Sequence, residues 1–357
     1  MFRRLKFSQR VSLEDRYLFA RQLHVLQRAG VPILSSLQSL EEQLPSSRLR
    51  QVLEVIYQDL TNGHTLSQAF ARQSGVFDPL FVGLIRVGEQ AGALDDVLKR
   101  IADLTAWEIE LRSKIAQALQ YPIIVVATLL VALSVMIVFV LPRFTEFFSS
   151  MKIQLPIQTR LVMGLSRLLV GYGWLLGLGL LAAGCAWWRL LRTERGKLWW
   201  HRNLLRLPIM GKLYMELLMS RFARMVSTLT ASGMPILDTL ALSGDSINNR
   251  YIQKGLSGVR ERVKGGETLA RALAADHLFP PIVLQMVRTG EETGRLDELL
   301  GSIADYYDQQ VTYLVKRLIT YIEPALLIVV SLGVLLMATA VLVPMWDMVK
   351  LFKQSGG

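Results

Sequence analysis

The sequence predicts an all-α membrane protein with two repeated six-helix cytoplasmic bundles and three transmembrane helices. Three observations lead to this fold class. Long stretches carry no charge, two polar segments resemble each other, and apolar residues recur at helical spacing with no long alternating strand pattern. Hydrophobic residues make up 52% of the 357 residues, more than a typical soluble domain contains.

Three stretches are long and apolar enough to cross a bilayer. Residues 123–141 and 325–343 each run for 19 residues without a charge. A helix of that length extends about 28 Å, close to the hydrocarbon thickness of a membrane. Residues 168–188 form a third stretch, rich in glycine and bounded by Arg167 and Arg189. One such stretch can be a buried core helix, but three together indicate transmembrane helices.

The polar segment 1–122 has the pattern of successive helices. Ser12 is a typical N-cap residue, and Gly30 with Pro32 is expected to end the first helix. Asp78 followed by Pro79 opens a later helix, which Gly88 and Gly92 are expected to break. Between them lie two apolar stripes, formed by Ile33, Leu37, Leu40 and Leu44 and by Leu49, Val52, Leu53, Ile56 and Leu60. Six antiparallel helices are the expected packing.

The second polar segment, 189–324, repeats the first. Phe19, Gly30 and Pro32 match Phe222, Gly233 and Pro235, and the register holds over about 120 residues with one deletion. Other matched pairs are Gly63 with Gly266, Arg86 with Arg288, Asp103 with Asp305, Pro122 with Pro324 and Pro142 with Pro344. Chance does not keep one register over such a length, so we expect two copies of one module.

The most distinctive polar feature is a Gly-Glu-x-x-Gly-x-Leu-Asp motif that occurs once in each segment. Its residues are Gly88, Glu89, Gly92 and Asp95 in the first copy and Gly290, Glu291, Gly294 and Asp297 in the second. One interpretation is a helix–helix turn, in which glycines supply positive φ angles and each glutamate pairs near Arg86 or Arg288. The others are a partner-binding surface and a weak cation site.

No catalytic constellation is visible, so we expect a protein that is not an enzyme and uses no cofactor or metal. The four histidines lack metal-binding spacing, and the phosphate-binding loop of nucleotide hydrolases is missing. The single cysteine, Cys185, excludes an intrachain disulfide. Gly173 and Gly177 lie in an apolar stretch, where their spacing favours close helix packing over dinucleotide binding.

Charge predicts the orientation in the membrane. Within about 20 residues of the spans, ten Lys and Arg residues lie on the side of 1–122 and 189–324, against six on the other side. The first side is therefore expected to be cytoplasmic. No apolar signal-peptide segment follows the basic residues 1–10. Much of the net charge of +11 gathers in 189–206, which suits anionic lipid headgroups rather than nucleic acid.

The doubled pattern of Phe-Ala-Arg, Gly-x-Pro-Ile-Leu and Arg-x-Gly-Glu-x-x-Gly-x-Leu-Asp resembles the inner-membrane platform proteins of type II secretion and type IV pilus systems. The resemblance covers about Glu14 to Met348. It implies a non-enzymatic protein of the bacterial inner membrane with a cytoplasmic N-terminus. Its implied partners are a cytoplasmic hexameric ATPase, other inner-membrane assembly components, (pseudo)pilins and further copies of itself.

The resemblance also places the segments. It makes 142–167 a periplasmic loop and 344–357 a periplasmic tail. Many members carry an additional N-terminal segment before the first bundle, for which residues 1–11 leave little room. Two other classes are a secondary transporter, which would need polar groups at mid-membrane, and a membrane enzyme or sensor, which would need a pocket in the bundles. The sequence does not distinguish protein secretion, pilus extension and DNA uptake.

Overall fold

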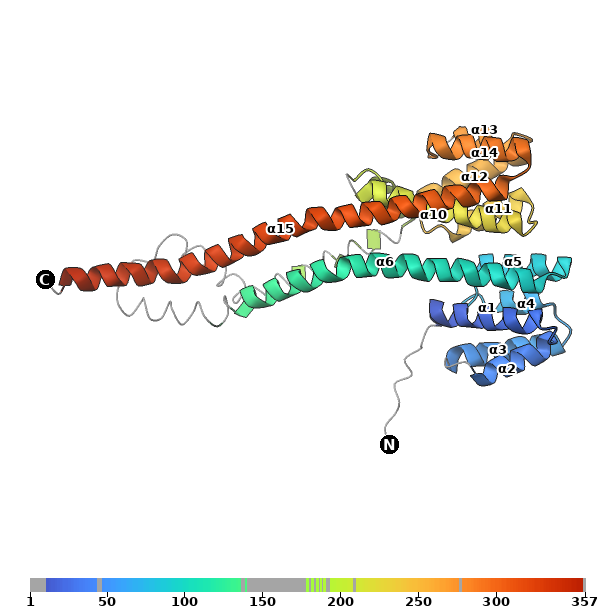
Figure 1. Cartoon of the computed structure of the whole chain (residues 1–357), viewed down its shortest axis with the longest axis horizontal. Helices are drawn as coiled ribbons and strands as arrows, with labels where there is room; N and C mark the ends of the chain where they lie inside the picture. Colours follow the sequence, from blue (N-terminus) through green and yellow to red (C-terminus); the bar gives the residue numbers. More distant parts are fainter. Residues whose placement is uncertain are drawn as a thin grey trace. The chain divides into compact units, whose positions relative to one another are not determined.

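Helix is the regular secondary structure of the described part of the chain, as the sequence predicts (Figure 1). The computed structural model describes residues 11–43, 47–135, 139, 178–179, 181–182, 184–185, 187, 189–190, 193–207, 210–275 and 278–355. By contacts the chain forms two compact units, Met1–Lys114 with Leu198–Tyr313 and Ile115–Lys197 with Leu314–Gly357. The first unit contains the polar parts of both repeats.

The two repeats have the same order of helices. In the first, these are α1 (Leu13–Arg28), α2 (Ile33–Gln43), α3 (Ser47–Thr61), α4 (Leu66–Arg72), α5 (Pro79–Ala91) and α6 (Leu94–Val135). In the second, they are α10 (Met210–Ala231), α11 (Ile236–Ser246), α12 (Arg250–Lys264), α13 (Leu269–Ala274), α14 (Pro281–Thr293) and α15 (Leu296–Ser355). Helix α9 (Glu194–Leu204) precedes the second set.

Local capping explains where several helices begin. The Ser12 hydroxyl accepts the amide of Asp15 at 3.0 Å, and the Asp15 carboxylate accepts the amide of Ser12 in return. Thr65 caps α4 in the same way with Gln68. Asp78 accepts the amide of Phe81 at 2.8 Å, so the predicted Asp-Pro start of α5 is confirmed.

The backbone confirms the internal repeat independently of side chains. Each described glycine with positive φ has a counterpart in the other repeat with nearly the same angle. The pairs are Gly30 (76°) with Gly233 (79°), Gly63 (87°) with Gly266 (93°), and Gly92 (67°) with Gly294 (69°). These angles are strained for residues that carry a Cβ, so the same three turns are built twice.

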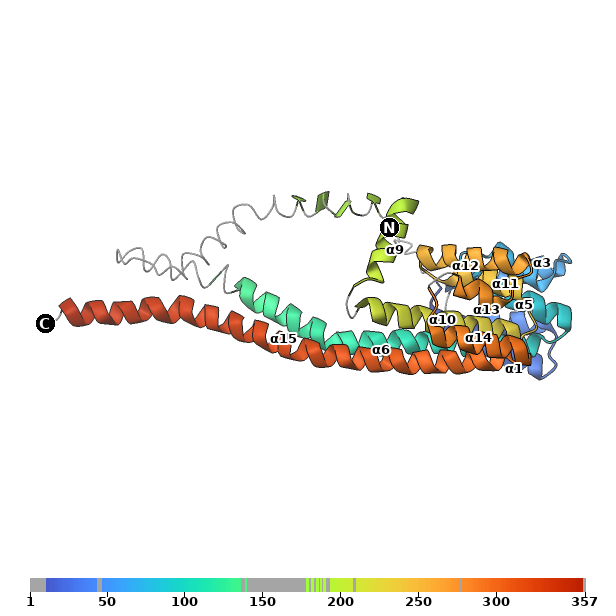
Figure 2. The same ribbon diagram turned by 90° about the horizontal axis from the view of Figure 1, so that it is seen from above.

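The apolar cores repeat as well. Phe19 packs against Phe77 with ring centroids 5.7 Å apart, and their counterparts Phe222 and Phe279 lie 5.2 Å apart. Four of the five residues of the predicted stripe on α3 are buried, with Ile56 completely covered, and Leu60 is partly buried. In both views α10 runs beside the polar half of α15 (Figures 1 and 2). Each repeat therefore folds around its own aromatic centre.

Three residues of types that often end helices lie inside helices here, and for Gly88 this corrects the expectation from the sequence. Pro122 lies inside α6 and Pro324 inside α15, so neither proline ends a helix. Each proline removes one backbone hydrogen bond, but an apolar segment offers no water to satisfy further open groups, so the helix continues. Gly88 also lies within α5, and only Gly92 ends that helix.

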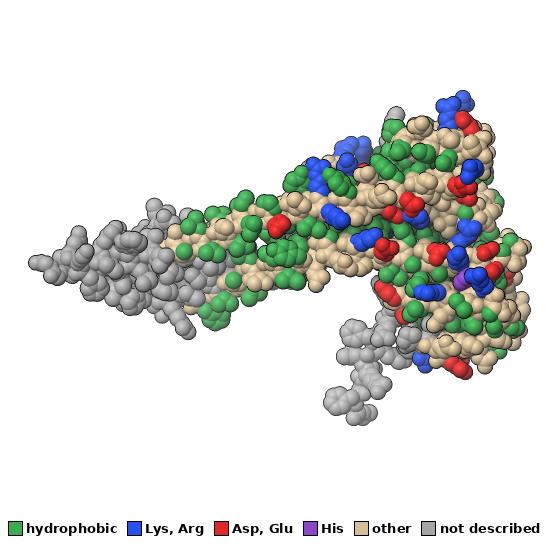
Figure 3. Space-filling view, viewed as in Figure 1, with side chains coloured by type: hydrophobic (Ala, Val, Ile, Leu, Met, Phe, Trp, Pro, Cys, Tyr) green, Lys and Arg blue, Asp and Glu red, His purple; other side chains and the backbone are tan. Residues whose placement is uncertain are grey.

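Two described helices are long and apolar enough to span a membrane. They are the segments Leu94–Ala132 and Leu296–Leu335, whose most apolar windows are 6% and 0% buried. Such exposure separates them from core helices of a soluble protein, and Figure 3 shows hydrophobic side chains along this part of the surface. The predicted loop 142–167 and most of the predicted span 168–188, with Gly173 and Gly177, lie outside the described residues.

Candidate functional site

Glu89 of the first Gly-Glu motif binds the N-terminus of a neighbouring helix. Its Oε1 accepts the amide of Leu66 at 2.6 Å, and its Oε2 accepts the amide and hydroxyl of Ser67 at 3.2 and 2.7 Å. These groups belong to the first turn of α4, whose amides have no partner within the helix. The negative charge also suits the positive end of the helix dipole. Glu89 thus ties α5 to α4.

Glu291 repeats this arrangement in the second copy. Its two carboxylate oxygens accept the amides of Leu269 and Ala270, at 2.8 and 3.1 Å, at the start of α13. The expected pairing with arginine is wrong for this residue, because Arg288 Nε instead donates to Glu292 at 3.0 Å. With both oxygens engaged by backbone donors, Glu291 acts as a helix cap.

The glycines of the motif serve two purposes. Gly92 and Gly294 adopt the left-handed conformation that ends α5 and α14, as the turn interpretation predicts. Gly88 and Gly290 allow close approach of the next helix. A Cβ at Gly88 would lie 3.0 Å from Val97 Cβ, and one at Gly290 would lie 2.9 Å from Leu296 Cα.

Asp95 and Asp297 stand in the first turns of α6 and α15, where their charge favours the helix N-terminus. Their backbone carbonyls hold a third helix. His24 Nδ1 lies 2.8 Å from the Asp95 carbonyl oxygen, and Ser227 Oγ donates to the Asp297 carbonyl oxygen at 2.8 Å. His24 and Ser227 are counterparts in the repeat, so the contact is kept although the residue type differs.

A polar junction between the repeats was not predicted from the sequence. The Trp107 indole N–H of α6 donates to Asp308 Oδ2 of α15 at 2.8 Å, and Arg224 Nη2 donates to the same oxygen at 2.7 Å. Ser220 donates to the other oxygen of Asp308. Burial lowers the pKa of Arg224, but hydrogen bonds to Asp305 and Asp308 outweigh it, so the net shift is upward.

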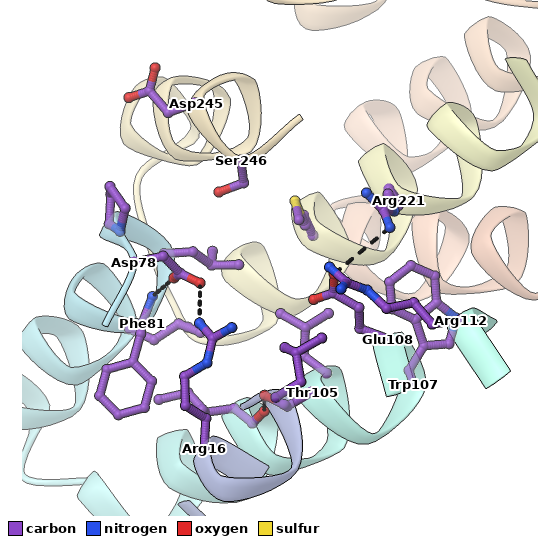
Figure 4. Close-up of a pocket in the computed structure, with 17 residues that line it drawn as sticks. Arg16, Asp78, Phe81, Thr105, Trp107, Glu108, Arg112, Arg221, Asp245 and Ser246 are labelled. Carbon is purple, nitrogen blue, oxygen red and sulfur yellow. Dashed lines mark hydrogen bonds and ion pairs between the residues drawn. The ribbon is translucent and has the colours of Figure 1, made fainter. Parts of the chain in front are cut away.

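A cleft of about 310 Å³ lies beside this junction, between residues of both repeats (Figure 4). On one side of the cleft, Glu108 Oε1 lies 2.8 Å from Arg112 Nη2 and 3.7 Å from Arg221 Nη2 of α10. On the other side of the cleft, Arg16 Nη1 lies 3.4 Å from Asp78 Oδ2. Of these ion pairs only Glu108–Arg221 joins the two repeats, and the others lie within the first.

The one sequence signal for the junction is a mismatch within the repeat. Trp107 and Asp308 correspond to Gln309 and Ala106, so neither residue is repeated. A search for matched positions therefore passes over both. Their contact joins residues 201 positions apart in the chain, which local periodicity does not reveal.

The duplicated cores, turns and apolar helices coincide with a known protein family. The family described as type II secretion system (T2SS), protein F, matches residues 19–142 and again 222–344. The chain belongs to this family. The two matches begin at Phe19 and Phe222 and end at Pro142 and Pro344, which are counterparts in the repeat.

Curated relatives from both kinds of machine are similar over most of their length. Type II secretion system protein F of Aeromonas hydrophila is 32% identical over 342 residues, which cover 96% of this chain and 88% of the relative. The protein of that name from Vibrio cholerae is 33% identical, with 96% and 84% covered. Type 4 fimbrial assembly protein PilC of Pseudomonas putida is 32% identical, with 92% and 82% covered.

Proposed function

We propose that this T2SS protein F family member is the inner-membrane platform protein of a type II secretion or type IV pilus machine. The observation that carries the proposal is the family match to both repeats, together with relatives named for secretion and for pilus assembly. The two long apolar helices support a place in the membrane. The comparisons include both machines, so the proposal names both.

At finer detail, two six-helix bundles, 1–122 and 189–324, lie in the cytoplasm and three helices, 123–141, 168–188 and 325–343, cross the membrane. The bundles bind a hexameric ATPase, and its motion is coupled to the insertion of (pseudo)pilins. The chain itself performs no catalysis. The closely tied helices within each repeat support this role, because a rigid body can transmit a displacement. Gly173 and Gly177, outside the described residues, are kept as a proposed helix-packing pair.

The Gly-Glu motifs, Gly88 to Asp95 and Gly290 to Asp297, are proposed to present a partner surface. Since Glu89 and Glu291 hold helix termini, the partner is expected to contact the exposed residues that follow them. These are Gln90 and Glu292, which are counterparts in the repeat and both exposed. A structural role and a docking role can therefore be separated by substituting the neighbours rather than the glutamates.

The test is assembly in cells that lack the native copy of the gene. We expect Gln90→Lys with Glu292→Lys to reduce secretion or piliation and co-purification of the ATPase at least several-fold, at unchanged membrane level and melting temperature. The matched control carries Gln51→Lys with Ser257→Lys, which are exposed positions on α3 and α12, away from the motifs. Normal assembly by the Gln90 and Glu292 variant would refute the docking surface. Normal secretion and piliation in the deletion strain would refute the platform function.

A further inference from the structure

The first repeat holds part of the second in an apolar groove. The groove is lined on α4 and α5 by Ala71, Val82, Gly83 and Arg86, and across it by Met234, Asp238 and Leu242 of the second repeat. Leu242 comes so close that a Cβ on Gly83 would lie 2.5 Å from its Cδ1. Val82 is only 6% exposed. Helix α11 is thus seated on α5.

The second repeat has the same groove without α11 or its equivalent. It is a hollow of about 800 Å³, and its lining includes Ala274, Leu284, Gln285 and Arg288, the counterparts of the four residues named above. All of the lining comes from α13, α14 and the cap residue Thr268. Leu284 is partly exposed here, whereas its counterpart Val82 is buried. The face that is covered in one repeat is open in the other.

The helix that corresponds to α11 is also uncovered. This is α2, whose Ser35 and Ser39 are the counterparts of Asp238 and Leu242, and Val31 just before α2 is the counterpart of Met234. Ser35 and Ser39 are four residues apart and so lie on one face of the helix, where Ser35 is exposed and Ser39 is half-buried. In Figure 1, α2 and the α13–α14 pair lie at opposite ends of the unit that contains both repeats. Within one chain, α2 is therefore remote from the open groove.

We propose that α2 of one copy docks in the α13–α14 groove of a second copy, repeating between chains the contact that joins the repeats within a chain. The sizes of the facing residues suit this arrangement, because in each contact a large side chain faces a small one, although the large one belongs to the helix in one contact and to the groove in the other. Within the chain the large Leu242 lies over the small Gly83, and between chains the large Gln285 faces the small Ser39. An amide facing hydroxyls makes a more polar contact, which suits reversible association.

The contact joins two different surfaces, so it is heterologous. Such contacts either close into a ring or continue as a chain of copies. This inference rests on the proposed function for the existence of an oligomer, and it adds the surfaces that form it. The occupant is a second copy because the fold supplies both the groove and its missing helix.

Disulfide trapping in membranes that contain only the full-length protein tests the proposal. The background carries Cys185→Ala, which removes the single native cysteine. On oxidation, Ser39→Cys with Gln285→Cys should give linked dimers and larger species, at least five times the yield of either single variant. Gly83→Cys with Leu242→Cys is the positive control and should close within one chain, without a change in mass.

Three results of the trapping experiment would overturn the proposal. They are dimers of equal yield from Ser39→Cys alone, a link between residues 39 and 285 within one chain, and no dimer although the control pair closes. These results do not depend on secretion, on pili or on the ATPase. Failure of the surface is therefore distinguishable from failure of the platform function.

A steric test needs no cross-link. Ala274 lines the open groove and is exposed, while the adjacent Ala275 is equally exposed but does not line it. Ala274→Trp should lower the mass of the purified protein in mild detergent to that of the monomer, and Ala275→Trp should leave the wild-type oligomer intact. An Ala274→Trp protein that assembles like wild type, or a monomeric wild type, would refute the docking.

Discussion

At the residue scale, a carboxylate in each motif replaces the hydrogen bonds that a helix N-terminus lacks. Glu89 accepts three hydrogen bonds from Leu66 and Ser67, and Glu291 accepts two from the equivalent turn. Glu291 is also the more exposed of the two. Because solvent competes for exposed donors, the second contact should stabilise the fold less than the first.

We therefore expect Glu89→Ala to lower the free energy of unfolding by about 2 kcal/mol and Glu291→Ala by about 1 kcal/mol. Thermal unfolding of the full-length protein in detergent measures both. Glu292→Ala is the control, since its exposed pair with Arg288 should contribute less than about 0.5 kcal/mol. Equal melting temperatures for Glu291→Ala and Glu292→Ala would show that the cap does not stabilise the fold.

The glycines within α5 and α14 support a second residue-scale prediction. At Gly88 an added methyl group would meet the Val97 side chain at 3.0 Å, while at Gly290 it would meet the Leu296 backbone at 2.9 Å. A side chain can move aside more easily than backbone. We expect Gly290→Ala to destabilise by about 2–3 kcal/mol and Gly88→Ala by about half as much, measured by the same unfolding assay. The reverse order would contradict the argument.

Residue patterns predicted which glycine of the motif ends the helix, but not which groups the glutamate binds. Gly92 at a left-handed helix end follows from its place after an amphipathic segment. The partners of Glu89 lie 22 and 23 residues earlier in the chain, and a nearby arginine looked like a better partner. Tertiary packing decides the partner, because it brings the first two backbone amides of α4 against Glu89 of α5.

At the scale of elements, helix starts were predictable because capping is local. Ser12, Thr65 and Asp78 each bond a backbone amide three residues on. Proline is a poorer guide to where helices end. Pro122 and Pro324 lie within long helices, where the apolar sequence on the C-terminal side keeps the backbone hydrogen-bonded and overrides the local preference of proline.

Three helices meet at Asp308, and this junction gives an element-scale prediction. Trp107 of α6 and Arg224 of α10 donate to one carboxylate oxygen of α15. Trp107→Phe removes one donor to a charged acceptor and should cost about 1.5–2 kcal/mol of unfolding free energy. In an Asp308→Ala background the same change should cost at least about 1 kcal/mol less, because the acceptor is already absent.

The measurement is a double-mutant cycle on the full-length protein. Trp187→Phe is the control for loss of an indole, since it lies in the other unit and is well exposed. Additive effects of the Trp107 and Asp308 changes would mean that the hydrogen bond contributes little and that Trp107 acts through packing. A coupling near the expected value would identify the junction as an energetic link between the repeats.

At the scale of the whole molecule, duplication was the feature that the sequence predicted best. The paired glycines and the two aromatic centres follow from matched residues such as Phe19 and Phe222. The contact between the repeats did not follow, because it is made by residues that have no matching residue type in the other repeat. Gly83 with Leu242 and Trp107 with Asp308 are such residues, and only the structure brings them together.

Membrane topology is the last prediction, and the shared orientation of the two repeats depends on it. In each repeat a polar bundle passes into a long apolar helix, α6 or α15, so the same polar-to-apolar direction occurs twice. Two copies with one orientation need an even number of crossings between their soluble parts. The sequence predicts two, at 123–141 and 168–188, and the excess of Lys and Arg predicts that both bundles are cytoplasmic.

Reporter fusions at Gly63, Ser150, Gly265 and Gly357 check this arrangement. Alkaline phosphatase should be active only at Ser150 and Gly357, and a cytoplasmic fluorescent reporter should be bright only at Gly63 and Gly265. An active phosphatase at Gly265 would mean an odd number of crossings between the repeats, and the two bundles would then face opposite sides of the membrane. A bright reporter at Gly357 would instead mean that 325–343 does not cross, because an uncrossed third segment leaves the C-terminus beside the second bundle.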